Sequence, residues 1–161
     1  MIKQEIAQML NKQINKELHS GYLYMEFANY YETRNLTGFA NWYVKQAGEE
    51  YEHAMKIRKF MIDANVDVHF SQLDDVSKNF TNDGTPLQEG LKHEQYITAS
   101  IYEIYEKARE LNDHLSAEFL VWFIREQGEE ETNAQYLIDR YEMTGGAGPG
   151  LFMLNRELGE R

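Results

Sequence analysis

The sequence contains no cysteine, which excludes disulfides, thiolate zinc sites and iron–sulfur clusters. It also has no long apolar run. The longest, Phe119 to Ile124, is far shorter than the roughly 20 residues that cross a membrane. The first residues, Met1 to Glu5, are polar and lack the apolar region of a signal peptide. We therefore expect a cytoplasmic protein with no membrane partner.

Basic residues are few, with 16 Lys and Arg against 27 Asp and Glu and a net charge of −11. Nucleic acid phosphates need a basic surface, so a nucleic-acid partner is not expected. An acidic surface suits a protein that gathers cations, although acidity can also serve solubility alone. The 161 residues are enough for one domain with a substantial core.

Four long segments place apolar side chains three or four residues apart, the period of a core-facing α-helix. The third begins at Thr85, which we expect to cap the helix, and Pro86 suits its first turn. The glycine-rich stretch 145–150 predicts a flexible hinge. The predicted helices lie at about 2–32, 36–64, 85–111 and 115–143, followed by a short terminal helix at about 151–158.

The connections between these helices predict their arrangement. Short turns join the first helix to the second and the third to the fourth, so each pair is antiparallel. A helix of about 28 residues is about 42 Å long, and the roughly 20 residues between the second and third helices span up to about 65 Å. The predicted fold is all-α: one domain over 1–161, with a four-helix bundle over about 2–143, one long crossover between helices two and three, and a short C-terminal helix.

Each long segment carries one glutamate on its otherwise apolar, inward-facing stripe. An ionised carboxylate buried alone would cost several kcal/mol, so we expect a cation between them. His53 and Gln127 lie one helical turn from the second and the fourth glutamate and share their faces, so we expect both to belong to the metal site as ligands. The four glutamates, all near mid-helix, are Glu17, Glu50, Glu94 and Glu130.

Carboxylates with a single imidazole suit ferrous iron, which accepts mixed oxygen and nitrogen ligands. We expect Glu50 to bridge two irons about 3.5–4 Å apart, the usual spacing in two-metal sites. Glu17 and His53 would complete one iron, and Glu94 and Glu130 the other. This ligand set leaves positions open for dioxygen, so the predicted reaction is the oxidation of ferrous iron.

Tyr24 lies seven residues after Glu17 on the same stripe. It would lie beside the site, where it could donate a hydrogen bond or an electron; the alternative is an ordinary core tyrosine with a satisfied hydroxyl. Trp122 lies off the core stripe and is expected to serve packing. The remaining histidines, expected to be surface or structural residues, are His19, His69, His93 and His114.

The candidate residues read Glu17, Tyr24, Glu50-Tyr51-Glu52-His53, Glu94 and Gln127-Gly128-Glu129-Glu130. This pattern resembles the non-haem bacterial ferritins over nearly the whole chain. Ferritin-like di-iron bundles carry Glu-x-x-His on two helices, whereas the fourth helix here has Gln127-x-x-Glu130. The resemblance implies that the second iron is held more weakly, so that oxidised iron moves on to a store. It also implies a hollow shell of 24 identical subunits that holds ferric mineral.

The same resemblance assigns Glu49, Glu126 and Glu129, with Glu130 shared, to a third iron site on the cavity side. The alternative is a solvated acidic face. Haem is not expected, because Tyr51 stands where bacterioferritin carries its haem-binding methionine.

A cage needs contact surfaces between subunits, and the first two helices carry a second apolar face that a lone bundle would not need. The residues expected on this face are Leu18, Tyr22, Met25, Phe39 and Trp42.

Three other functions are alternatives to ferrous oxidation and storage. A di-iron oxidase or peroxidase acting on a small molecule would favour a second Glu-x-x-His. A non-catalytic cage subunit that only nucleates mineral would lack Glu17, Glu50 and His53. A twelve-subunit DNA-protecting ferritin would place its iron ligands between subunits and often carry a basic tail, which the acidic balance opposes.

Overall fold

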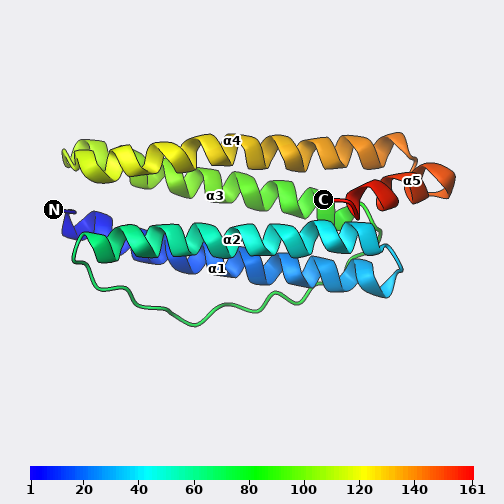
Figure 1. Ribbon diagram of the computed structural model, residues 1–161, viewed down its shortest axis with the longest axis horizontal. Helices are drawn as coiled ribbons and strands as arrows, with labels where there is room; N and C mark the ends of the chain where they lie inside the picture. The colour runs from blue at the N-terminus through cyan, green and yellow to red at the C-terminus, as the bar shows by residue number, and fades with distance from the viewer.

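The computed structural model describes all 161 residues and confirms the all-α fold. Four long helices form an elongated bundle, with a short fifth helix at one end (Figure 1). No helix has an apolar stretch long enough to cross a membrane. The helices are α1 (Gln4–Thr33), α2 (Thr37–Asp63), α3 (Thr85–Glu110), α4 (His114–Met143) and α5 (Gly148–Leu158).

Tight turns make α1 and α2, and likewise α3 and α4, antiparallel neighbours (Figure 1). Each turn contains an asparagine in the left-handed conformation, Asn35 with φ 60° and Asn112 with φ 55°. Asparagine tolerates this conformation better than most residues, so the chain can reverse there. Asp113 then caps α4, because its side chain accepts a hydrogen bond from the backbone N–H of Ser116 at 3.1 Å.

One predicted cap and one predicted helix start were wrong. Thr85 does not cap α3; it is the first helical residue, and the side-chain oxygen of Asn82 accepts hydrogen bonds from the backbone N–H groups of Gly84 (2.9 Å) and Thr85 (3.1 Å). α5 begins at Gly148 rather than near residue 151, because Pro149 fits the first turn of a helix. The hinge is therefore shorter than the predicted stretch 145–150.

The crossover between α2 and α3 runs along the length of the bundle, as predicted (Figure 1). Two asparagines on α1 hold it. The side chain of Asn11 donates to the carbonyl of His69 (2.9 Å) and accepts from its N–H (2.8 Å), and Asn15 accepts from the N–H of Ser71 (2.8 Å). These bonds satisfy backbone groups of an otherwise irregular segment.

The hydrophobic core consists of two clusters rather than one. One cluster, near α5, includes Tyr24, Tyr43 and Leu137. The other, toward the start of α1, includes Ile14 and Phe123. Between them along every long helix lies a layer of buried polar side chains. The polar layer is therefore enclosed by packed apolar residues on both sides.

Candidate metal centre

The polar layer contains the four glutamates that the sequence singled out, one from each long helix. Their exposed fractions are 1% for Glu17, 1% for Glu50, 3% for Glu94 and 5% for Glu130. His53 and Gln127 are buried in the same layer. Burial of four carboxylates at one level is unfavourable without compensating charge, because each loses its hydration.

Glu17, Glu50 and His53 form the first candidate metal group. Each offers one ligand atom, and these atoms all lie within 4.8 Å of one another. One oxygen of Glu17 (Oε2), one of Glu50 (Oε1) and Nδ1 of His53 are buried and have no hydrogen-bond partner. Buried polar atoms are almost always paired in proteins. Three neighbouring side chains that each keep a buried ligand atom unpaired fit a divalent cation.

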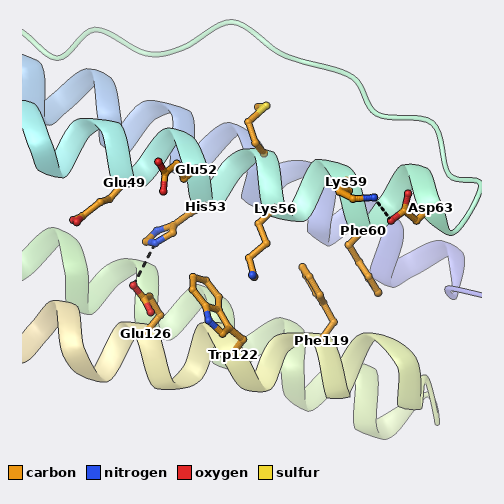
Figure 2. Close-up of a pocket in the computed structure, with 11 residues that line it drawn as sticks. Glu49, Glu52, His53, Lys56, Lys59, Phe60, Asp63, Phe119, Trp122 and Glu126 are labelled. Atoms are coloured by element: carbon orange, nitrogen blue, oxygen red, sulfur yellow. Dashed lines mark hydrogen bonds and ion pairs between the residues drawn. The ribbon is translucent and has the colours of Figure 1, made fainter.

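His53, Glu126 and Glu130 form a second group whose ligand atoms also lie within 4.8 Å of one another. Nε2 of His53 is 3.7 Å from Oε1 of Glu126, while its Nδ1 is 3.6 Å from Oε2 of Glu50. The two nitrogens of one imidazole therefore face two acidic groups. Figure 2 shows His53 and Glu126 reaching toward each other from α2 and α4.

A pocket of about 700 Å³ opens beside this pair, between α2 and α4 (Figure 2). Trp122 lines it and packs edge-to-face against the His53 ring, with ring centres 5.6 Å apart. The ammonium of Lys56 lies 4.2 Å from the centre of the Trp122 ring. Trp122 lies off the core stripe, as expected, and it covers one side of the His53 imidazole.

Glu94 is the most fully hydrogen-bonded of the four glutamates. The Tyr24 hydroxyl donates to its Oε1, and the Gln127 amide donates to its Oε2 at 3.2 Å. The same Gln127 nitrogen also contacts the carbonyl of Glu94 and the hydroxyl of Thr98, both at 3.3 Å. Gln127 thus directs its nitrogen rather than its oxygen at the site, so it positions Glu94 instead of offering a ligand atom.

Two further glutamines support the site, and neither was predicted from the sequence. Gln46 donates to Oε2 of Glu130 at 2.6 Å. Gln13 donates to Oε1 of Glu17 at 2.9 Å and is itself held by the hydroxyl of Ser100 at 2.6 Å. Each lies four residues before a glutamate of the centre, the spacing that places side chains on one helix face. That spacing could have identified both glutamines as neighbours of the metal centre.

Burial raises the pKa of all four carboxyl groups. It raises the pKa of Glu17 to about 8, helped by the charge of Glu50. It raises the pKa values of Glu94 and Glu130 to about 7. The pKa of Glu50 is also well above its usual range, because of burial first and the charge of Glu94 next. Without a cation the centre therefore holds protons near neutral pH, and a bound cation would displace them.

The residues assigned to a third iron site are not gathered into one group. Glu126 lies with His53 and Glu130, Glu129 is exposed, and Glu49 forms an ion pair with Arg161 at 2.7 Å. None of the other four histidines belongs to either metal group. The third site stays a prediction.

Tyr24 acts in this structure as a buried hydrogen-bond donor. Its hydroxyl is directed at Glu94, and burial together with the Glu94 charge raises its pKa well above the usual range, so it keeps its proton. We expect Tyr24→Phe to slow the predicted oxidation of ferrous iron about threefold to tenfold, because it removes one net hydrogen bond. Stopped-flow absorbance measures the rate. Tyr102→Phe, which alters an exposed tyrosine on α3, is the control; equal rates in both variants would refute the role.

Comparisons with known proteins agree with this geometry. The family model described as the ferritin-like domain matches residues 7–144. A bacterial non-haem ferritin from Bacteroides fragilis (strain 638R) is 32% identical, covering the whole of both chains. One from Staphylococcus aureus (strain USA300) is 30% identical, covering all of this chain and 97% of the other.

Solved structures of ferritins are also similar to this chain. A closed form of the Archaeoglobus fulgidus ferritin, engineered by site-directed mutagenesis, superposes with a TM-score of 0.98 at 31% identity, covering all of this chain and 98% of the other. An open-pore ferritin from the same hyperthermophilic archaeon superposes with a TM-score of 0.97 at 31% identity, covering 99% of this chain and 98% of the other.

Proposed function

The chain belongs to the ferritin family, and we propose that this iron storage protein oxidises ferrous iron with dioxygen at the carboxylate centre between its four long helices. One observation carries the proposal. Glu17, Glu50 and His53 bring ligand atoms within 4.8 Å of one another, and each of the three side chains has one buried polar atom without a hydrogen-bond partner. A structural polar cluster would pair these atoms with one another or with neighbouring donors.

Two ferrous ions are the substrate. Glu17 and His53 hold one of them, Glu94 and Glu130 hold the other, and Glu50 lies between the two pairs. Each ferrous ion gives up one electron, and two electrons are the number that reduces dioxygen to peroxide. Tyr24 and Gln127 keep Glu94 in place by donating to its two oxygens. Carboxyl groups with pKa values of about 7 to 8 release their protons as the ions bind.

The oxidised iron needs a route away from the centre. The pocket beside His53 and Glu126 supplies one, because it reaches from the buried imidazole to the surface between α2 and α4 (Figure 2). Glu49, Glu52 and Glu126 line it together with the lysines Lys56 and Lys59. Acidic side chains along this path offer successive oxygen ligands to a hard cation.

Ferrous iron added to the apoprotein in air tests the proposal through the ferric absorbance. We expect a fast phase that saturates at about two irons per subunit, as a two-metal site requires, followed by slower mineral growth. A passive storage subunit would give slow oxidation without a saturating phase. A small-molecule oxidase would return the iron to the ferrous state with a co-substrate instead of accumulating mineral.

The storage function also needs a hollow assembly, and we propose 24 copies of the chain. An apolar groove of about 440 Å³ runs along α1 and α2, with exposed fractions of 55% for Tyr22 and 39% for Met25. Val44 and Tyr51 extend the same groove. Exposed apolar area of this kind marks a contact between proteins. Because the groove lies on the bundle's outside, a second copy can cover it without disturbing the metal centre.

The apolar face was predicted correctly only in part. Tyr22 and Met25 are exposed on it, but Phe39 is fully buried. α5 covers the start of α2, so Phe39 packs in the core with Leu154 and Leu158. Phe39 therefore contributes to stability within the subunit, not to assembly.

We expect Tyr22→Glu combined with Met25→Glu to break the assembly into small species, because two buried charges facing their symmetry copies cost several kcal/mol. Native mass spectrometry gives the number of subunits. The control, Tyr102→Glu, adds a charge at an exposed site on α3. An intact large assembly in the double variant would show that the groove is not a subunit contact.

A further inference from the structure

Lys16 on α1 directs its charged end at a hydroxyl rather than at a carboxylate. Its ammonium donates to the side-chain oxygen of Ser100 on α3 at 2.7 Å and lies 5.1 Å from the centre of the Tyr96 ring. The side chain is half-buried and lines a pocket of about 450 Å³ between α1, α3 and the crossover. Contacts with α3 therefore hold this lysine in place.

A chain of hydrogen bonds leads from the lysine to the metal centre. The Ser100 hydroxyl donates to the side-chain oxygen of Gln13 at 2.6 Å, and the Gln13 nitrogen donates to Oε1 of Glu17 at 2.9 Å. Ser100 and Gln13 are both buried. The ammonium is thus three hydrogen bonds away from a proposed iron ligand.

The chemistry of each group gives this chain one direction. An ammonium can only donate, and a serine hydroxyl has a single hydrogen. Because the Ser100 oxygen accepts from Lys16, its hydrogen is available for the oxygen of Gln13. The Gln13 amide then presents its nitrogen to Glu17. A reversed amide would place its carbonyl oxygen against a carboxylate oxygen, and like partial charges repel each other.

This arrangement decides which oxygen of Glu17 is free. Oε1 accepts from Gln13, whereas Oε2 is buried without a hydrogen-bond partner. Groups that hydrogen-bond to a metal ligand orient it and change the affinity of the site. Resting on the proposed iron-binding function, we propose that Lys16 and Ser100 are positioning residues, which act through Gln13 to hold Glu17 with only Oε2 available to a metal ion.

The charge of Lys16 and its hydrogen bond act on metal binding in opposite directions. A positive charge repels a cation, so removal of the charge alone would tighten metal binding. Removal of the hydrogen bond lets Ser100 and Gln13 turn away from this arrangement, so it weakens metal binding. The direction of the change in affinity therefore separates positioning from simple charge repulsion.

Anaerobic titration of the assembled apoprotein with Co²⁺ tests the proposal, because the visible absorbance of Co²⁺ depends on its number of ligand atoms. We expect Ser100→Ala and Lys16→Met each to weaken the first binding step about threefold to tenfold, the effect of losing about one net hydrogen bond. The absorbance per bound ion should also fall, because a released Glu17 can bind through both oxygens. Lys16→Arg should restore both values, since it keeps a charged donor and the pocket has room for it.

Lys12→Met is the matched control. Lys12 is exposed on α1 one turn before Lys16, lines the same pocket and carries the same charge. We expect this variant to keep the absorbance per ion and to show no weakening of the first step. Equal affinities and spectra in Lys16→Met and Lys12→Met would overturn the proposal, and so would weakening in Ser100→Ala alone.

Glu17→Ala reports separately on the proposed function. If this variant and the unaltered protein bind Co²⁺ equally, the four-helix centre itself is refuted. If Glu17→Ala abolishes the first step while Ser100→Ala and Lys16→Met leave it unchanged, the centre stands and only the positioning role is overturned. Thermal melting of each variant verifies that it is folded.

Discussion

Replacing Glu17, Glu50 and His53 together by alanine is expected to lower the initial rate of ferrous oxidation by about 100-fold or more, since even supporting residues around metal ligands are worth 10- to 100-fold. These three side chains form one candidate metal group, and each has a buried polar atom without a hydrogen-bond partner. Without them the first ion has no buried site, and the second loses its shared carboxylate. Stopped-flow measurement of ferric absorbance in air gives the rate.

Glu103→Ala is the control for this experiment, because Glu103 is an exposed glutamate on α3 and its loss changes surface charge without touching the centre. Circular dichroism of the triple variant should show the same helix content as the unaltered protein. Oxidation that stays fast in the triple variant would place the catalyst elsewhere on the protein, at the surface or on the mineral.

The second large effect is a loss of apoprotein stability as the pH rises. The folded-state pKa is raised from 4.5 to about 8 for Glu17 and to about 7 for Glu94 and Glu130. A raised carboxyl pKa means that the folded state binds the proton more tightly than the unfolded state. The resulting stability is fully present below the ordinary value of 4.5 and is lost as the pH rises through about 7 and 8.

We therefore expect the midpoint of thermal unfolding, measured with a chelator present, to fall between about pH 5 and pH 8, by about 2–4 °C for each kcal/mol lost. Glu17→Gln combined with Glu50→Gln should make this fall smaller, because the two amides stay neutral while Glu94 and Glu130 still titrate. Divalent metal should reverse the fall in the unaltered protein only, since binding stabilises the folded state. A midpoint that rises over this range would contradict the account.

The polar layer could be predicted because it breaks a strong pattern. Glu50 interrupts a stripe that includes Ala47 and Ala54, and the helical period alone places it inward. The structure buries it as expected. The need for a cation or another partner also follows from the sequence, because a buried carboxylate is unfavourable without one.

Contacts between helices were harder to predict, because they depend on how each helix is rotated and on which side chains reach across. Gln46 lies four residues from Glu50 but bonds to Glu130 on α4. The proximity of Glu126 on α4 to His53 on α2 was likewise not predicted. Helical spacing carries no information about partners on another element.

The ends of elements were the other source of error. Phe39 lies near the start of α2, where the sequence pattern gave it an outward face. In the structure α5 packs over this end of α2 and buries Phe39. Arg161 likewise acquires its contacts with Glu49 and Gln46 only because α5 turns back toward α2. Such long-range docking is set by tertiary packing rather than by local pattern.

The most direct test of the central claim is anomalous diffraction from crystals of the apoprotein soaked with ferrous iron without oxygen. The account predicts two iron peaks per subunit about 3.5–4 Å apart, as in other two-metal sites. One should lie between Glu17 and His53 and the other between Glu94 and Glu130, with Glu50 touching both. Iron found only at surface carboxylates, with the four-helix centre free of anomalous signal, would contradict it.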